Sequence, residues 1–331
     1  MANAAPAVAF PAPEIFEATF WMRPKFGNII DGCVRRSDPE FPIEYRLFQR
    51  GPPIGKENKK GAIYFGEKYN RVTQGQQGLV VIKVVKKSWL EINPRENIMS
   101  EIHVAQAHGD NVHIGSILEA LEDNEHYFII MPRLGYDIYP SENDRHVVTP
   151  NVTRLFVQNL QVLKRLGILH CDISPDNIIH SENGGYFLID FAMAKQCAKD
   201  EHGQFLPIAR EIPVKSFGKF QYMSPEMYDT QTPGNLYFGV HLWAIGCTLF
   251  YLWTRRYLYK TPGDACWRYF ALNCVDDREV KENERVKDIL LLFQGLSQQQ
   301  QNLLNRIFIH NPEDRVTVDD ILNDPYFTPV E

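Results

Sequence analysis

Two short clusters near the middle of the chain hold the residue types that metal-assisted group transfer requires. Residues 170–177 read HCDISPDN, which puts Asn177 five residues after Asp172. At that spacing, one carboxylate can face a substrate hydroxyl while an amide oxygen binds a metal ion. Asp190 ends an apolar strand pattern in the stretch LIDFA, a position suited to a magnesium ligand. Each residue alone could be a turn or cap residue, but the set in this order indicates chemistry.

A third candidate, Lys83, lies inside the apolar strand pattern GLVVIKVV. Burying a lysine is costly unless its charge is paired. We predict that Glu101, on the helical pattern that follows, is its partner, and such a pair would hold the ammonium against nucleotide phosphates. The alternative is that Lys83 lies on the exposed face of a half-buried strand.

The elements that must position these residues divide into two halves. Strand-like patterns come first, in YRLF, GAIYFG, GLVVIKVV and HYFIIM, with one helical pattern in NIMSEIHVAQA. Helices dominate after Gly135, beginning with Thr149 as a cap and Pro150 in the first turn. This order predicts an α+β fold with two lobes. The boundaries we expect are an N-terminal extension at 1–40 and one domain at 41–331, with an N-lobe at 41–131, a hinge at 132–135 and a C-lobe at 136–331.

The composition argues against several other classes of protein. The 331 residues carry a net charge of −6, so no broad basic field exists to bind nucleic acid or anionic lipid. Six scattered cysteines without a CxxC pair indicate reduced, intracellular usage, not a disulfide scaffold or a zinc site. The N-terminal stretch lacks the basic region of a secretory signal, and no apolar run approaches the ~20 residues of a membrane span. We therefore expect a cytoplasmic protein without a membrane span.

Taken together, the motifs resemble those of the eukaryotic protein kinase family. VIK, HCD…N, DFA, MSPE, a Trp-centred helix and NPEDR occur in the family's order and approximate spacing over roughly residues 45–327. The resemblance implies a two-lobed protein-kinase-like fold, with a strand-rich N-lobe and a helical C-lobe. It also implies an enzyme that uses ATP and Mg²⁺ to transfer the γ-phosphoryl group to Ser or Thr hydroxyls of protein substrates.

The resemblance assigns a role to each matching position. Lys83 would pair with Glu101 and position the nucleotide, and Asp172 would orient or deprotonate the acceptor hydroxyl. Asn177 and Asp190 would hold magnesium. The nucleotide-binding positions would be Gly55, Gly61, Ile63, Val81, Lys83, Met131, Pro132, Leu134 and Ile179.

The resemblance also implies contacts at the hinge and in the activation segment. Adenine recognition at the hinge needs the carbonyl of Pro132 and the amide N–H of Leu134, and proline lacks only the donor. Met131 would gate the back of the adenine pocket. Glu226 and Arg315 match the ion pair that fastens the activation segment, and such pairs hold geometry more than they add stability.

The phosphate-covering loop departs from the family pattern. Gly55 and Gly61 are kept, but Glu57 stands where the central glycine is expected. Backbone N–H groups close over phosphates best when side chains are absent, so we expect weaker ATP affinity. The added negative charge is offset in part by three nearby lysines, Lys56, Lys59 and Lys60.

Other departures concern the catalytic and activation segments. Ala192 replaces a glycine but removes no ligand. Cys171 replaces the arginine that commonly receives an activation-loop phosphate, and Ser216 is the only hydroxyl residue between Ala192 and Gly218. We therefore do not expect loop phosphorylation to switch the protein on. His241 stands where an aspartate usually braces the catalytic loop, and a neutral imidazole can accept one such hydrogen bond, not two.

Ser174 and Lys219 look like an exchanged pair. Ser/Thr-specific members of the family usually have lysine at the first position and threonine at the second, and the two meet beside the catalytic aspartate. We hypothesise that the Lys219 ammonium reaches the γ-phosphate region, which makes Lys219 a candidate catalytic residue. The alternative is an exposed lysine on a diverged loop.

Two other functions stay open at this stage. A pseudokinase would use the fold as a nucleotide-binding or scaffolding module without turnover, which the altered glycine loop, Ala192 and His241 favour. A small-molecule kinase is a further alternative, because HxDxxxxN followed by IDF also occurs in choline- and aminoglycoside-kinase-like enzymes. The MSPE segment and Arg315 argue against it. Asp176 either meets basic residues that flank the acceptor or, as we favour, is a solvated surface carboxylate.

Overall fold

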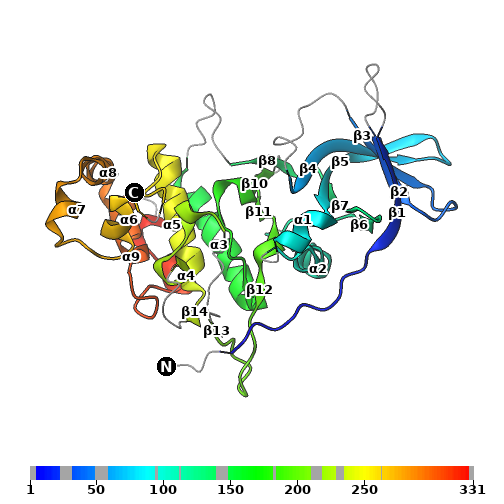
Figure 1. Cartoon of the computed structure of the whole chain (residues 1–331). Coiled ribbons are helices and arrows are strands. Elements are labelled where there is room, and N and C mark those ends of the chain that lie inside the picture. The colour runs from blue at the N-terminus through cyan, green and yellow to red at the C-terminus, as the bar shows by residue number, and fades with distance from the viewer. Residues whose placement is uncertain are drawn as a thin grey trace. The chain divides into compact units, whose positions relative to one another are not determined.

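The chain divides into two compact units that differ in secondary structure (Figure 1). The computed structural model describes residues 5–22, 32–48, 59–93, 96–111, 113–138, 148–181, 184–209, 218–228, 235–261 and 263–327. Residues 10–135 form a strand-rich unit, and residues 136–331 together with residues 1–9 form a helix-rich unit. The predicted α+β class, with strands first and helices second, is confirmed.

Within the described residues of the strand-rich unit, seven strands close into a barrel in the order β1-β2-β3-β4-β5-β7-β6. Neighbouring strands are antiparallel except for β1 and β6, whose parallel pairing closes the barrel and leaves no open edge. The bounds are Phe16–Met22 (β1), Gly32–Arg36 (β2), Ile43–Leu47 (β3), Gly61–Asn70 (β4), Gly75–Lys86 (β5), Glu119–Glu122 (β6) and His126–Pro132 (β7).

Strands β1 and β2 lie inside the segment 1–40, where we expected an N-terminal extension and not part of the domain. The stretch FEATF alternates, with Phe16, Ala18 and Phe20 all packed on the barrel core. This period-two signal was present in the sequence, but it is short and follows an Ala- and Pro-rich stretch. The barrel core begins in this segment and not at residue 41.

The two faces of β5 face different parts of the strand-rich unit because successive side chains of a strand alternate. Val80, Ile82 and Val84 belong to the barrel core. Val85 instead joins a second cluster with Ile98 and other residues of helix α2. The helices of this unit are Lys87–Ile92 (α1) and Ile98–His108 (α2).

The helix-rich unit contains mostly helices, with short strands between them. Its helices are Pro150–Leu166 (α3), Pro225–Tyr228 (α4), Gly239–Thr254 (α5), Ala265–Phe270 (α6), Arg278–Glu282 (α7), Glu284–Gln294 (α8), Gln298–Ile307 (α9) and Val318–Leu322 (α10). Its strands are β8 (Gly135–Asp137), which begins at the unit boundary, Ile168–Leu169 (β9), Ile178–Ser181 (β10), Tyr186–Leu188 (β11), Lys195–Gln196 (β12), Ile208–Ala209 (β13) and Asn235–Leu236 (β14). Single 3₁₀ turns are Pro175–Asn177 (η1), Phe191–Met193 (η2), Phe220–Tyr222 (η3) and Pro325–Phe327 (η4).

Helices α3 and α5 are the two long helices of this unit, and they pack against each other (Figure 1). The hydroxyl of Thr149 accepts a hydrogen bond from Val152 N and Pro150 occupies the first turn, as predicted. Helix α5 is apolar on all sides, which is typical of a buried helix, and most of its side chains are buried. None of the described helices combines the length and the apolar character that crossing a bilayer requires.

A buried carboxylate at the start of β6 ties three strands of the barrel together. Glu119 is 6% exposed, accepts a hydrogen bond from the Tyr45 hydroxyl at 2.6 Å and pairs with Arg36. The Arg36 guanidinium lies 3.4 Å from the ring centroid of Phe16 on β1. A paired charge of this kind is costly to break, because the remaining partner is left uncompensated.

We therefore expect Glu119→Ala to lower the free energy of unfolding by about 3 kcal/mol. Glu122→Ala, three residues along the same strand, removes a carboxylate that is 37% exposed and pairs with Lys87. This change is expected to cost less than about 1 kcal/mol. Urea denaturation of both variants measures the two losses. Equal losses would show that Glu119 contributes no more than a surface ion pair.

Candidate active site

In the strand-rich unit, four residues predicted to contact the nucleotide lie on one face of the barrel. Directly opposite residues of antiparallel strands share a face. Ile63 on β4 is opposite Lys83 on β5, and Val81 on β5 is opposite Met131 on β7. Because Val81 and Lys83 are two residues apart on one strand, all four side chains share the face on which helix α2 packs.

Lys83 is buried and paired, which decides between the two interpretations of the sequence. Its ammonium lies 2.7 and 2.8 Å from the two carboxylate oxygens of Glu101, and the two residues are 6% and 5% exposed. Glu101 stands in the first turn of α2, which begins after Asn97, whose side chain accepts a hydrogen bond from Met99 N. The predicted pair is confirmed, and it is fixed by a capped helix on one side and a central strand on the other.

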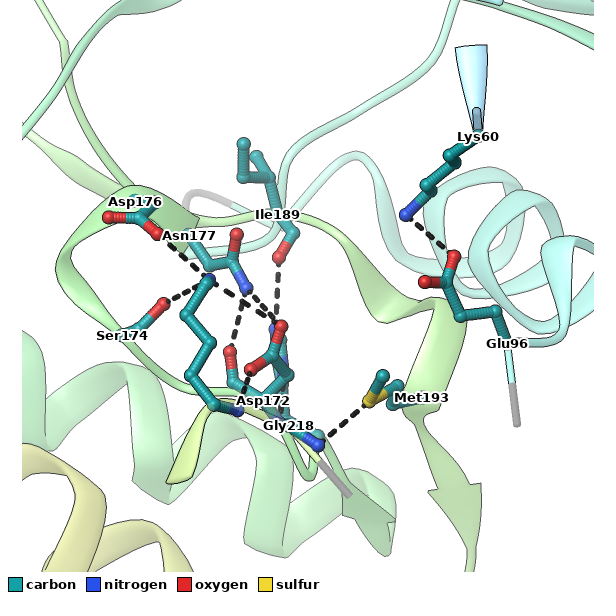
Figure 2. Close-up of polar contacts among 11 residues, drawn as sticks. Lys60, Glu96, Asp172, Ser174, Asp176, Asn177, Ile189, Met193 and Gly218 are labelled. Carbon is teal, nitrogen blue, oxygen red and sulfur yellow. Dashed lines mark hydrogen bonds and ion pairs between the residues drawn. The ribbon is translucent and has the colours of Figure 1, made fainter. Parts of the chain in front are cut away.

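Gly61 begins β4 where two backbones come very close. Its φ is +149°, and a Cβ there would lie 1.9 Å from the Val84 carbonyl oxygen, so no other residue fits. Lys60, one of the three lysines expected to offset Glu57, forms an ion pair with Glu96 at 2.6 Å (Figure 2). Gly55, Lys56 and Glu57 lie outside the described residues.

The hinge positions begin at the last residue of β7. Pro132 is its last residue and is opposite Val80, and the Arg133 N–H donates to the Leu79 carbonyl at 3.3 Å. Leu134 comes after the strand and is half-buried. The missing donor of Pro132 falls at the strand end, where the ladder tolerates it.

In the helix-rich unit, the hairpin of β10 and β11 brings the two predicted metal ligands to one end. Asn177 immediately precedes β10, Asp190 follows β11, and Ile189 N donates to the Asn177 carbonyl at 3.0 Å. Asp190 has a φ of +62°, a conformation that only a few non-glycine residues adopt. Ile179 lies within the same hairpin, opposite Phe187.

The Asp172 carboxylate is held by two donors (Figure 2). The Lys219 backbone N–H donates to Oδ1 at 3.0 Å, and the Asn177 side-chain amide donates to Oδ2 at 3.0 Å and to the Asp172 carbonyl at 2.7 Å. Burial raises the pKa of Asp172, and the positive charge of Lys219 limits that rise. The carboxylate is therefore fixed in orientation and is more basic than an exposed aspartate.

The Lys219 ammonium lies beside this carboxylate. It donates to the Ser174 hydroxyl at 2.7 Å, pairs with Asp176 at 2.9 Å and lies 3.7 Å from Asp172 Oδ2. Burial lowers the pKa of Lys219, but the carboxylates of Asp172 and Asp176 raise it by more, so the ammonium stays charged. Lys219 and Ser174 do meet beside Asp172. Sequence reasoning did not identify Asp176 as a partner of Lys219, because the contact depends on the turn η1.

The residues present fit a magnesium ion that shares its coordination with phosphates. Both amide protons of Asn177 are used by Asp172, so its amide oxygen remains as an acceptor beside the Asp190 end of the hairpin. Across the described part of the chain, no cluster of three or more His, Cys, Asp or Glu could hold a metal by itself. Magnesium is commonly bound through one or two protein oxygens together with substrate phosphates and water.

Two buried histidines brace the backbone next to Asp172. The His241 Nε2 accepts a hydrogen bond from His170 N at 2.9 Å, which confirms the predicted single bond. The His170 Nε2 donates to the Ile189 carbonyl at 3.0 Å, which links the catalytic loop to the hairpin. Burial lowers the pKa of His170 to about 4 and that of His241 to about 3, so both rings are neutral at physiological pH.

A buried network anchors the end of the activation segment. The Arg315 guanidinium donates to both carboxylate oxygens of Glu226, at 2.6 and 3.1 Å, as predicted. The Trp243 indole donates to the Tyr259 hydroxyl at 2.6 Å, and that hydroxyl donates to the Met223 carbonyl at 2.6 Å. Sequence reasoning missed Tyr259, because a tyrosine in the stretch RRYLYK gives no sign of its hydrogen-bond partner.

The neutral His241 makes stability depend on pH in a defined direction. The unfolded chain protonates this ring near pH 6.5, whereas the folded protein does so only near pH 3, so acidification favours the unfolded state between these values. The amide oxygen of His241→Asn can still accept from His170. Between pH 7.5 and 5.5, we expect the free energy of unfolding of this variant to fall by about 1.4 kcal/mol less than that of wild type. Chemical denaturation at both pH values measures this, with the exposed His202→Asn as the control. An identical fall in all three proteins would contradict the assignment.

Comparison with known proteins agrees with this geometry. The protein kinase domain family matches residues 56–327. The chain is 23% identical to cyclin-dependent kinase 7 of Dictyostelium discoideum over 277 residues, which cover 76% of this chain and 72% of that protein. It is 23% identical to mitogen-activated protein kinase 12 of Mus musculus over 63% of this chain and 59% of that protein. It is 26% identical to serine/threonine-protein kinase ppk34 of Schizosaccharomyces pombe over 49% of this chain and 39% of that protein. The chain belongs to the protein kinase domain family.

Proposed function

We propose that this chain is an active ATP-dependent protein kinase that transfers the γ-phosphoryl group to Ser or Thr hydroxyls of protein substrates. The observation that best supports activity is the fixed Asp172 carboxylate, held by Asn177 and the Lys219 backbone. A reacting group that is already oriented lowers the entropic cost of the transition state. The name of the ppk34 relative supports Ser/Thr specificity.

Each of these groups has a task in the proposed reaction. Asp172 orients the acceptor hydroxyl and takes up its proton as the oxygen attacks, for which a raised pKa is favourable. Lys83, fixed by Glu101, neutralises phosphate charge. Asn177 and Asp190 would hold the magnesium ion, which supplies further charge neutralisation on the transferred group when bound.

We further propose that Lys219 supplies the cation that a catalytic-loop lysine normally supplies. Its ammonium is tethered between Ser174 and Asp176 and lies within 4 Å of the Asp172 carboxylate. The side chain is 38% exposed, so it can also reach a phosphate at the site.

The six free cysteines support a reducing, cytoplasmic location.

The pseudokinase alternative has one specific observation in its favour. His241 gives the catalytic loop one hydrogen bond where an aspartate can accept two. A less firmly braced loop would lower the rate without removing any ligand of nucleotide or metal. Turnover therefore separates the two functions.

Removing a metal ligand is the first test of activity. We expect wild type to transfer labelled phosphate from Mg-ATP to a degenerate peptide library, and Asp190→Ala to reduce transfer by roughly 100-fold or more because charge neutralisation is lost. Glu201→Ala removes an exposed carboxylate of the same segment and is expected to match wild type. Equal transfer by wild type and Asp190→Ala, with nucleotide binding intact, would contradict the proposal.

The exchanged pair predicts a distinct kinetic signature. We expect Lys219→Ala to lower kcat by about 10- to 100-fold with little change in KM for ATP. It should also shift the acidic limb of the pH–rate profile to higher pH, because the Lys219 charge holds the pKa of Asp172 down.

Two comparisons make this test specific. The exposed Lys281→Ala is the matched control. The double exchange Ser174→Lys with Lys219→Thr should be faster than Lys219→Thr alone, since it restores a cation beside Asp172. The proposal for Lys219 is wrong if Lys219→Ala stays within a few-fold of wild type.

A further inference from the structure

The N-terminal residues of the chain pair with the segment that follows Asp190. Residues 5–9 belong to the helix-rich unit, where Ala5 forms a parallel bridge with Ile208 and Val8 an antiparallel bridge with Gln196. Three backbone hydrogen bonds hold them: Ala5 N to Pro207 O at 3.1 Å, Ala209 N to Ala5 O at 2.9 Å and Val8 N to Gln196 O at 2.9 Å.

These bonds join the N-terminal residues to β12 and β13 through two isolated bridges. Strand β12 otherwise pairs with β9, directly before the catalytic loop, and β13 pairs with β14. Between them the chain turns back on itself, with Lys199 bridged to Phe205. Addition of an extended segment to an open strand edge is a strong mode of backbone recognition, because it satisfies N–H and C=O groups that the edge leaves unpaired.

A neutral residue stands where the family pattern has the receptor of an activation-loop phosphate. Cys171 replaces the arginine expected to receive the phosphate, is 4% exposed, and packs in an apolar cluster with Leu169, Cys197 and Ile208. Burial raises the pKa of the Cys171 thiol to about 12, so it is a neutral group at physiological pH. Residues 195–209 are therefore held by apolar packing and by the backbone bonds to Ala5 and Val8, without a charged receptor at position 171.

The residues that follow in sequence contact helix α2 within the strand-rich unit. The Gln106 side chain accepts from Glu14 N at 3.0 Å and donates to the Glu14 carbonyl at 2.7 Å. The ring centroids of Phe10 and His103 are 5.5 Å apart, and Ile15 packs on the cluster that contains Ile98. Helix α2 carries Glu101, so these contacts steady the partner of Lys83.

We propose that residues 5–15 form an N-terminal brace, a positioning element that orders residues 195–209 and steadies α2 in place of activation-loop phosphorylation. The proposal rests on the kinase activity proposed above. Because the brace is part of the same chain, its effective concentration is high and no separate activator is needed. Its positioning residues act through Gln196, Ile208 and Gln106, not on the substrate.

A single backbone donor tests the first contact in the full-length protein. Val8→Pro deletes the bond to Gln196, whereas Val8→Ala keeps it and changes only a side chain that is 48% exposed. Ala7→Pro is the matched control. Ala7 is exposed, and among the described residues its N–H makes no backbone hydrogen bond. We expect Val8→Pro to lower kcat by about five- to tenfold with KM for ATP within about twofold.

Amide hydrogen exchange gives a readout that does not depend on turnover. Val8→Pro should lower protection in residues 195–209 by about tenfold and leave α5 unchanged, while Val8→Ala and Ala7→Pro match wild type. If wild type transfers no phosphate, the proposed function fails, yet exchange still shows whether the brace orders this segment. Exchange and kcat that are the same in Val8→Pro and Ala7→Pro overturn the brace. Lost protection with unchanged kcat overturns its positioning role.

Two further variants test the contact with α2 and the independence from phosphorylation. Gln106→Ala should lower kcat by about threefold, whereas Gln77→Ala, an exposed glutamine of the same unit, should not. Ser216→Ala should retain kcat within about twofold of wild type, since it removes the hydroxyl between Ala192 and Gly218. A loss of most activity in Ser216→Ala would show that phosphorylation, not the brace, activates the protein.

Discussion

A nearly buried carboxylate must keep its hydrogen-bond acceptors satisfied, and this requirement at Asp172 organises the residues around it. Asn177 and the Lys219 backbone occupy its two oxygens, and each donor is fixed by a different turn. Gly218 must be glycine, because a Cβ there would lie 2.5 Å from the Cys171 carbonyl oxygen. The catalytic loop and the end of the activation segment are thus closely packed at one charged group.

The helix-rich unit replaces several charged groups of the family pattern with neutral ones. Cys171 and His241 are buried and uncharged, and Ser174 takes the position of a lysine. Lys219 restores a positive charge beside Asp172, so the charge balance at the site is kept with a different residue. The neutral groups can be buried without a partner charge, which lets apolar packing on α5 hold this region.

The main constraint on the strand-rich unit is the pairing of its strand edges, since an open sheet would leave backbone N–H and C=O groups unpaired. Strand β1 closes the barrel by pairing with β6, and Glu119 with Arg36 and Tyr45 fixes that closure from inside. The closed barrel then fixes the register of β5, which determines that Lys83 faces α2 and not the barrel core. A one-residue slip would reverse this face.

The sequence by itself determined the family, the order of elements and most of the candidate site, because Lys83, Glu101, Asp172, Asn177 and Asp190 occur in a specific order and spacing. Alternation and capping signals located the β5 strand and the α3 helix, since these depend on local periodicity and turn residues. Tertiary structure alone decided that Lys219 contacts Asp176 and that Tyr259 links α5 to Met223. It also decided that residues 5–8 pair with β12 and β13. These contacts join residues far apart in the chain, and no local pattern records which distant backbone or side chain will meet them.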